Sequence, residues 1–199
     1  ADQPNSRWYS GAGIYRPVWL HVAPRSYILP EGIRITTENI SPAVVREEVA
    51  TSKEGNWTAE IYEGEKLVGQ CDDKNNTVVI KNAKLWSEDT PFLYTCLVKF
   101  GGDSAAANFG IRQIECDANG GFRINEKRVV LRGACVHHDN GLLGACAYKF
   151  AEERKAKQLK EAGFNAVRCA HNPCSKAFLD ACDKYGLLVM DEFSDMWYI

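Results

Sequence analysis

Apolar and polar residues alternate in short runs over the first half of the chain, from Trp8 to about Arg112. The alternation is clearest at residues 33–35, 57–61 and 94–100. Because successive side chains of a strand point to opposite faces of a sheet, this period predicts half-buried antiparallel strands. Turn-forming residues separate the runs at 30–32, 53–56, 72–76 and 101–103. That spacing is typical of a β-sandwich, and no enzyme motif lies within it.

The pattern changes in the second half, where strands and helices alternate. A hairpin is predicted at residues 120–129, and the elements expected after it are strands at 129–136, 165–169 and 187–190 and helices at 152–162 and 176–186. Gly163 is expected to end the first helix, and Ser175 is the expected N-cap of the second. Strands that alternate with helices in this way predict a parallel sheet.

By composition, the 199 residues are those of an ordinary globular chain. Hydrophobic residues make up 45% and charged residues 25%, which excludes disordered, collagen-like and coiled-coil proteins. The 24 Lys and Arg residues against 26 Asp and Glu give a net charge of −2, so no nucleic-acid partner is expected. No apolar run approaches the roughly 20 residues of a membrane span, and the first residues lack the apolar region of a signal peptide. We therefore expect no membrane association and favour a cytoplasmic location over a periplasmic or secreted one.

Eight cysteines are spread through the hydrophobic segments, without any Cys-x-x-Cys pair. Such pairs are typical of zinc sites, and their absence from the sequence disfavours zinc. A buried free thiol packs as a small apolar group. We therefore expect the mostly reduced thiols of a cytosolic protein rather than a disulfide framework.

Polar side chains gather at the end of each strand predicted in the second half. Residues 137–139 follow the first strand, residues 168–173 include the end of the second, and residues 191–192 follow the third. The carboxyl ends of parallel strands meet at one edge of a sheet, where ligands bind. The sequence therefore predicts one site built from three segments.

Each of these clusters also has a purely structural explanation. The two histidines can hydrogen-bond to loop backbone, Arg168 can pair with Asp191 or Glu192, and residues 172–173 can form a turn. A metal site would need a histidine beside a carboxylate, and the sequence has no helix with paired-histidine spacing. The G-x-S-x-G motif of a serine nucleophile is also missing from the sequence.

A carbohydrate ligand suits these residue types better. Imidazole, guanidinium and amide groups on a rigid edge can hydrogen-bond to several hydroxyl groups at once. Trp197, near the end of the third strand, could cover the apolar face of a sugar, or simply pack in the core.

Three segments carry a family resemblance: Leu131–Asp139, Gly163–Pro173 and Phe178–Glu192. They strongly resemble glycoside hydrolase family two, which holds β-galactosidases, β-glucuronidases and β-mannosidases. The resemblance implies a multidomain fold. Residues 1–23 would be the C-terminal remnant of a sugar-binding jelly roll. Within them, Ser10–Leu20 would form the last strands of that domain. Residues 24–112 would be an immunoglobulin-like β-sandwich, and residues 113–199 the first βα units of a TIM (β/α)8 barrel.

The resemblance also assigns roles to the polar residues. His137 and His171 match histidines that contact the sugar, and Arg168 matches an arginine that orients the nucleophile. Three neighbouring residues are expected to bind substrate as well: His138, Asp139 and Asn172. The family's acid/base and nucleophile glutamates follow the fourth and seventh barrel strands, so we expect both beyond Ile199 and no catalytic residue within this chain.

The expected protein is therefore a fragment of a retaining β-glycosidase, β-galactosidase-like and inactive alone, that hydrolyses terminal β-linked sugars. No cofactor is expected. Some β-galactosidases of the family bind magnesium through a glutamate and a histidine, but Met196 and Tyr198 align with these positions, so no metal is expected. The expected partners are a carbohydrate substrate and further copies of the chain, because three βα units leave an unpaired strand edge. The alternative is a non-catalytic carbohydrate-binding or interaction module.

Overall fold

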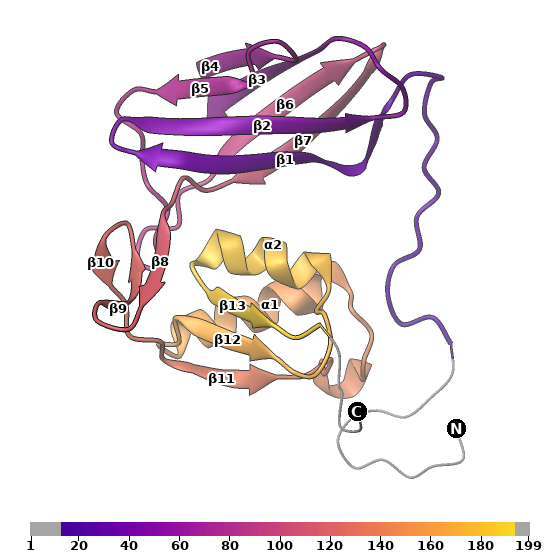
Figure 1. The fold of residues 1–199 in the computed structure, drawn as a ribbon. Helices are drawn as coiled ribbons and strands as arrows, with labels where there is room; N and C mark the ends of the chain where they lie inside the picture. Colours follow the sequence, from indigo (N-terminus) through magenta and orange to yellow (C-terminus); the bar gives the residue numbers. More distant parts are fainter. Residues whose placement is uncertain (1–12, 194–199) are drawn as a thin grey trace. The chain divides into compact units, whose positions relative to one another are not determined.

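A computed structural model describes residues 13–193, and its contacts divide the chain into two compact units (Figure 1). One unit holds residues 20–129. The other combines residues 13–19 with residues 130–193.

The unit of residues 20–129 contains two antiparallel sheets that share an apolar core. Their strand orders are β1-β2-β5 and β4-β3-β6-β7. The strands are β1 (Ile28–Ile40), β2 (Ala43–Thr51), β3 (Trp57–Glu63), β4 (Lys66–Asp72), β5 (Thr77–Ile80), β6 (Tyr94–Phe100) and β7 (Asp103–Phe109). Side chains from both sheets, including Val45, Ile61 and Tyr94, are fully buried in one cluster. The strands predicted at 57–61 and 94–100 are confirmed, because alternate residues of β3 and β6 are buried.

The turn predicted at residues 30–32 is wrong, because these residues lie within β1. The pairing of β1 with β2 shifts between Ile28 and Ile33, and Glu31 has a φ of 56°. A Cβ atom on Gly32 would lie 2.7 Å from the carbonyl oxygen of Ala50. The Pro-Glu-Gly sequence therefore marks a β-bulge, where an extra residue bends the strand without reversing it. The other three predicted turns do separate consecutive strands.

A third, small antiparallel sheet belongs to the same unit. It consists of β8 (Ile114–Asp117), β9 (Gly121–Ile124) and β10 (Lys127–Arg128), in the order β10-β9-β8. The predicted hairpin is confirmed, and its turn residues Asn125 and Glu126 both have positive φ, as a tight two-residue hairpin turn requires. By their contacts these strands group with the other strands of residues 20–129.

The second unit is built on a parallel sheet of order β11-β12-β13, as predicted. Its elements are β11 (Gly133–Val136), a short 3₁₀ helix η1 (Gly141–Leu143), α1 (Lys149–Glu161), β12 (Ala166–Cys169), α2 (Lys176–Tyr185) and β13 (Leu188–Asp191). The first strand begins four residues later than predicted. Ala156 of α1 and Phe178 of α2 pack with Val167 and Cys169 of β12 in one core. Arg168 alternates with these two residues and therefore lies on the opposite, exposed face of the sheet.

Both predicted ends of α2 are confirmed. The Ser175 hydroxyl accepts a hydrogen bond from the Phe178 N–H at 3.2 Å, which is the geometry of an N-cap. Gly186 follows the helix with a φ of 77°, the left-handed conformation that commonly ends helices.

Jelly-roll strands were expected within Ser10–Leu20, and the structure describes this segment from residue 13 onward. Residues 13–24 form no strand, and Ile14 and Val18 are largely exposed. A strand needs a neighbour for its backbone hydrogen bonds, and none of the described strands pairs with this segment. The Tyr15 carbonyl instead accepts a hydrogen bond from the Ala147 N–H at 3.0 Å.

Two further expectations bear on the protein's environment. All eight cysteines are free thiols. None of the helices within residues 13–193 is long and apolar enough to span a membrane.

Candidate functional site

The carboxyl ends of the three parallel strands bring the predicted site residues to one edge of the sheet. The strand register pairs Val136 with Cys169 and Cys169 with Asp191. The residues that follow these positions are therefore neighbours, although more than 50 positions separate His137 from Glu192 in the sequence. The predicted convergence of the three polar segments is thus present in the fold.

Arg168 forms an ion pair with Glu192. Its Nε donates to Glu192 Oε1 at 2.5 Å, and its Nη2 contacts the same oxygen. The hydrogen bond to Glu192 is the main cause that raises the pKa of Arg168 above its ordinary value. On the other side, Nη1 lies 3.6 Å from Cys135 Sγ. These contacts fix the direction of the guanidinium group on the exposed face of the sheet.

The second carboxylate oxygen of Glu192 contacts His171. His171 Nδ1 lies 3.3 Å from Glu192 Oε2, and the His171 ring meets the His137 ring edge-on with 5.3 Å between their centres. Glu192 therefore joins three of the predicted residues into one group: Arg168, His171 and His137. We call these four residues the strand-end cluster. Sequence analysis placed Glu192 in the third polar segment of the predicted site and named it as a possible partner of Arg168, but gave it no role toward the substrate.

His138 and Asn172 form a second group with a residue that sequence analysis did not predict. His138 Nε2 lies 2.5 Å from Asn172 Oδ1 and 3.2 Å from Arg16 Nη2, and Arg16 also donates to the Pro173 carbonyl. Burial, assisted by the charge of Arg16, lowers the pKa of His138. A neutral imidazole that carries its proton on Nε2 can donate a hydrogen bond to Asn172 Oδ1. Nothing in the local sequence indicates this contact, because Arg16 and His138 are 122 positions apart.

Asp139 has a visible role in the loop after β11. Its Oδ1 accepts a hydrogen bond from the Gly141 N–H at 2.8 Å, which shapes the entry into η1. Its predicted contact with substrate stays a prediction.

A small pocket with room for about one water molecule lies at this edge of the sheet. His137, His138 and Asn172 contribute to its lining, together with Glu152 and Lys155 of α1. Glu152 is buried, accepts a hydrogen bond from Asn140 Nδ2 at 2.7 Å and lies 3.3 Å from Lys155 Nζ. Sequence analysis missed this residue, since a glutamate in the first turn of a helix is ordinarily solvated.

This edge of the sheet can bind a polyhydroxylated ligand. Imidazole and amide groups supply donors and acceptors at fixed positions, and the Arg168 guanidinium lies beside them. Among residues 13–193, the histidines do not join a group of three metal ligands; Cys169, Cys174 and Asp191 form such a group. Trp197, Met196 and Tyr198 lie outside the described residues.

Comparison with known protein families agrees with this fold. Residues 32–112 match the model of glycosyl hydrolases family 2, and residues 117–196 match the model of that family's TIM barrel domain. The chain belongs to glycosyl hydrolase family 2. The two matches together cover most of the chain, including the strand-end cluster.

Individual family 2 proteins resemble the chain along nearly its whole length. It is 37% identical to a β-galactosidase of Bacteroides ovatus over 99% of the chain and 26% of that protein. It is 29% identical to a β-glucuronidase of Streptococcus agalactiae over 94% of the chain and 32% of that protein. The chain therefore spans between a quarter and a third of the length of these two relatives.

Solved structures show the same similarity. A family 2 member from Bacteroides cellulosilyticus superposes with a TM-score of 0.89 at 36% identity, over 99% of this chain and 31% of that one. A β-glycosidase from Bacteroides vulgatus superposes with a TM-score of 0.84 at 29% identity, over 96% of this chain and 27% of that one.

Proposed function

We propose that the chain supplies part of the substrate-binding edge of a retaining β-glycosidase that hydrolyses terminal β-linked sugars. The observation that carries the proposal is the strand-end cluster, in which Glu192 holds Arg168 with one oxygen and His171 with the other. Membership of family 2 supports it. The finer fold assignments, an immunoglobulin-like sandwich and a jelly-roll remnant at residues 1–23, stay predictions, as does a cytoplasmic location.

Retaining glycoside hydrolysis needs two carboxyl groups, one that protonates the leaving oxygen and one that forms the glycosyl-enzyme. In the proposed enzyme both belong to segments outside this chain. Arg168 would lie beside the nucleophilic carboxylate, and its positive charge would keep that carboxylate ionised. His137 and His171 would hydrogen-bond to sugar hydroxyls, with His138, Asp139 and Asn172 beside them.

β-Galactosides are the proposed substrates. The relative with 37% identity is named a β-galactosidase, whereas the β-glucuronidase from Streptococcus agalactiae is 29% identical.

The test is an assay of the whole protein with nitrophenyl β-galactoside, β-glucuronide and β-mannoside. We expect fastest turnover of the galactoside, and we expect His137→Ala and His171→Ala each to lower kcat/KM at least tenfold, as loss of a positioned hydrogen bond does. Lys157→Ala is the control, because Lys157 is exposed on α1 and forms a surface ion pair with Glu161.

The 199-residue chain alone should give no turnover above background, because positioning groups cannot replace the acid and the nucleophile. Turnover by that chain would contradict the placement of both carboxyl groups outside it. A whole protein that binds sugars but hydrolyses none of the three substrates would instead support the alternative of a carbohydrate-binding module.

A further inference from the structure

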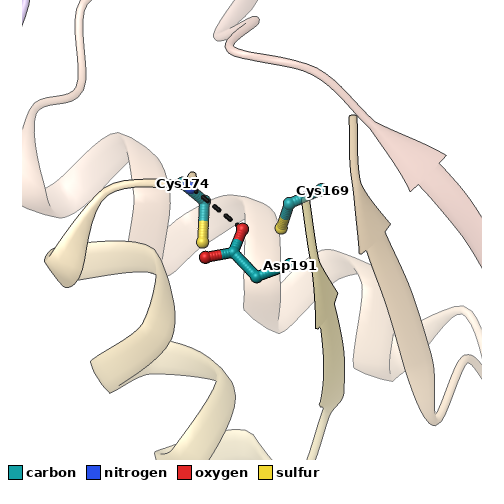
Figure 2. A group of neighbouring side chains, drawn as sticks. All are labelled: Cys169, Cys174 and Asp191. Atoms are coloured by element: carbon teal, nitrogen blue, oxygen red, sulfur yellow. Dashed lines mark hydrogen bonds between the residues drawn. The ribbon is translucent and has the colours of Figure 1, made fainter. Parts of the chain in front are cut away.

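Two cysteines and an aspartate converge next to the strand-end cluster. Cys169 is the last residue of β12, Cys174 lies in the loop that leads to α2, and Asp191 is the last residue of β13. Their ligand atoms, two Sγ and one carboxylate oxygen, all lie within 4.8 Å of one another. Figure 2 shows the three side chains pointing toward one another from the two strand ends and the loop.

The fold holds this arrangement in place independently of any ion. The strand register sets Cys169 beside Asp191, and the Cys174 N–H donates to Asp191 Oδ1 at 3.1 Å, the dashed line in Figure 2. Sequence analysis expected no metal site because it looked for Cys-x-x-Cys spacing and for histidine ligands. The two cysteines are five positions apart, and the turn at residues 170–173 returns the chain so that both thiols face one carboxylate.

We propose that Cys169, Cys174 and Asp191 bind a thiophilic divalent cation of the zinc class. Thiolate and carboxylate groups are typical zinc ligands. In a tetrahedral site with Zn–S bonds of about 2.3 Å, two sulfur ligands lie about 3.8 Å apart, so small side-chain rotations bring the three groups into place. Asp191 is exposed, which leaves the fourth position open to water. Magnesium and calcium are disfavoured, because they take oxygen ligands.

Binding exchanges protons for the metal ion and involves no oxidation. Each thiol loses its proton as a metal–sulfur bond forms, so one divalent ion releases two protons and the carboxylate adds a third ligand. Because the thiols must lose their protons to bind, affinity for the metal should rise as pH rises.

A bound ion would link the loop of residues 170–174 to both strands. This loop carries His171 and Asn172, so the ion would hold two predicted substrate-binding residues in place from outside the sugar site. The inference concerns metal binding and does not depend on the proposed glycosidase activity.

The experiment titrates Zn²⁺ alone into the whole protein, reduced and stripped of metal by a chelator, in an isothermal calorimeter. We expect one ion per chain and, from runs in buffers of different ionisation enthalpy, two protons released. Co²⁺ should give the intense near-ultraviolet absorption of cobalt–thiolate bonds. The double variant Cys169→Ser/Cys174→Ser should lose that absorption and bind Zn²⁺ at least tenfold more weakly. Cys146→Ser, a partly exposed thiol of the same unit, should behave as wild type.

Asp191→Asn provides a second variant in case the serine replacements impair folding. Its side-chain oxygen still accepts the Cys174 N–H while its ligand charge is removed, so we expect weaker Zn²⁺ binding with the cobalt–thiolate absorption retained. Circular dichroism checks that each variant is folded. Zn²⁺ affinity that is unchanged in the folded variants, or reduced wild-type protein without cobalt–thiolate absorption, would overturn the proposal.

Discussion

Arg168 projects from the exposed face of β12, and Glu192 fixes its guanidinium group there. We predict that Arg168→Ala in the whole protein lowers kcat on the order of a hundredfold, because correctly oriented catalytic contacts have effects of this size. Its thermal stability should change little, because exposed ion pairs contribute about 0–1 kcal/mol. Activity assays and thermal unfolding are the measurements, with Lys157→Ala as the control. Near-normal kcat combined with reduced thermal stability would assign Arg168 a structural role instead.

The protonation of His138 makes the stability of the second unit depend on pH. Burial lowers its pKa below the ordinary value of 6.5, so between the two values the unfolded chain binds more protons than the folded one. The contribution of neutral His138 is therefore fully present above about pH 6.5 and is lost as pH falls through the lowered pKa. We predict a destabilisation of this unit in acid that is smaller in His138→Gln. Amide hydrogen exchange of β11 and β12 as a function of pH measures it, and identical profiles for the two proteins would contradict the role of His138.

At the scale of elements, the local signals in the sequence predicted most of the second unit. Ser175 and Gly186 delimit α2 because a hydroxyl that caps the first turn and a glycine that adopts positive φ act through neighbouring residues alone. The turn predicted at residues 30–32 was wrong, because a Pro-Glu-Gly sequence favours a turn and a β-bulge alike. Only the partner strand β2 decides between the two, and it lies more than ten positions further along the chain.

The N-cap of α2 gives a prediction at the same scale. Ser175→Ala should lower the free energy of unfolding of the second unit by about 1 kcal/mol, because the Phe178 N–H loses the hydroxyl acceptor and keeps only the Ser175 carbonyl. Ser175→Asp keeps an acceptor at the N-cap and should recover most of this loss. Urea unfolding followed by circular dichroism is the measurement. Equal stability of the alanine variant and wild type would show that the cap contributes nothing.

At the scale of the whole molecule, the sequence indicated which residues would gather, but not how they would pair. The order of strands and helices placed residues 137–139, 168–173 and 191–192 at one edge, since this follows from parallel topology. The Arg16 contact to His138 and the approach of Cys169 to Asp191 depend on side-chain directions across distant segments. No periodicity or spacing rule carries that information.

The open sheet of the second unit leads to a prediction about association. Among the described strands, β11 and β13 are its two outer strands, and Met190 and Phe193 are exposed at the third strand and just beyond it. Unpaired strand edges beside exposed apolar side chains favour self-association. We predict that the isolated 199-residue chain forms dimers or larger species, and that Met190→Lys reduces them. Size-exclusion chromatography with light scattering decides, and a monodisperse wild-type monomer would contradict this expectation.

The central claim is that the strand-end cluster binds sugar, and a crystal structure of the whole protein with a galactose-like iminosugar tests it most directly. We predict that the ring hydroxyls lie within hydrogen-bonding distance of His137 and His171, with Arg168 beside the carboxylate next to the anomeric carbon. An iminosugar bound elsewhere, with Glu192, Arg168 and His171 in contact only with one another, would contradict the account.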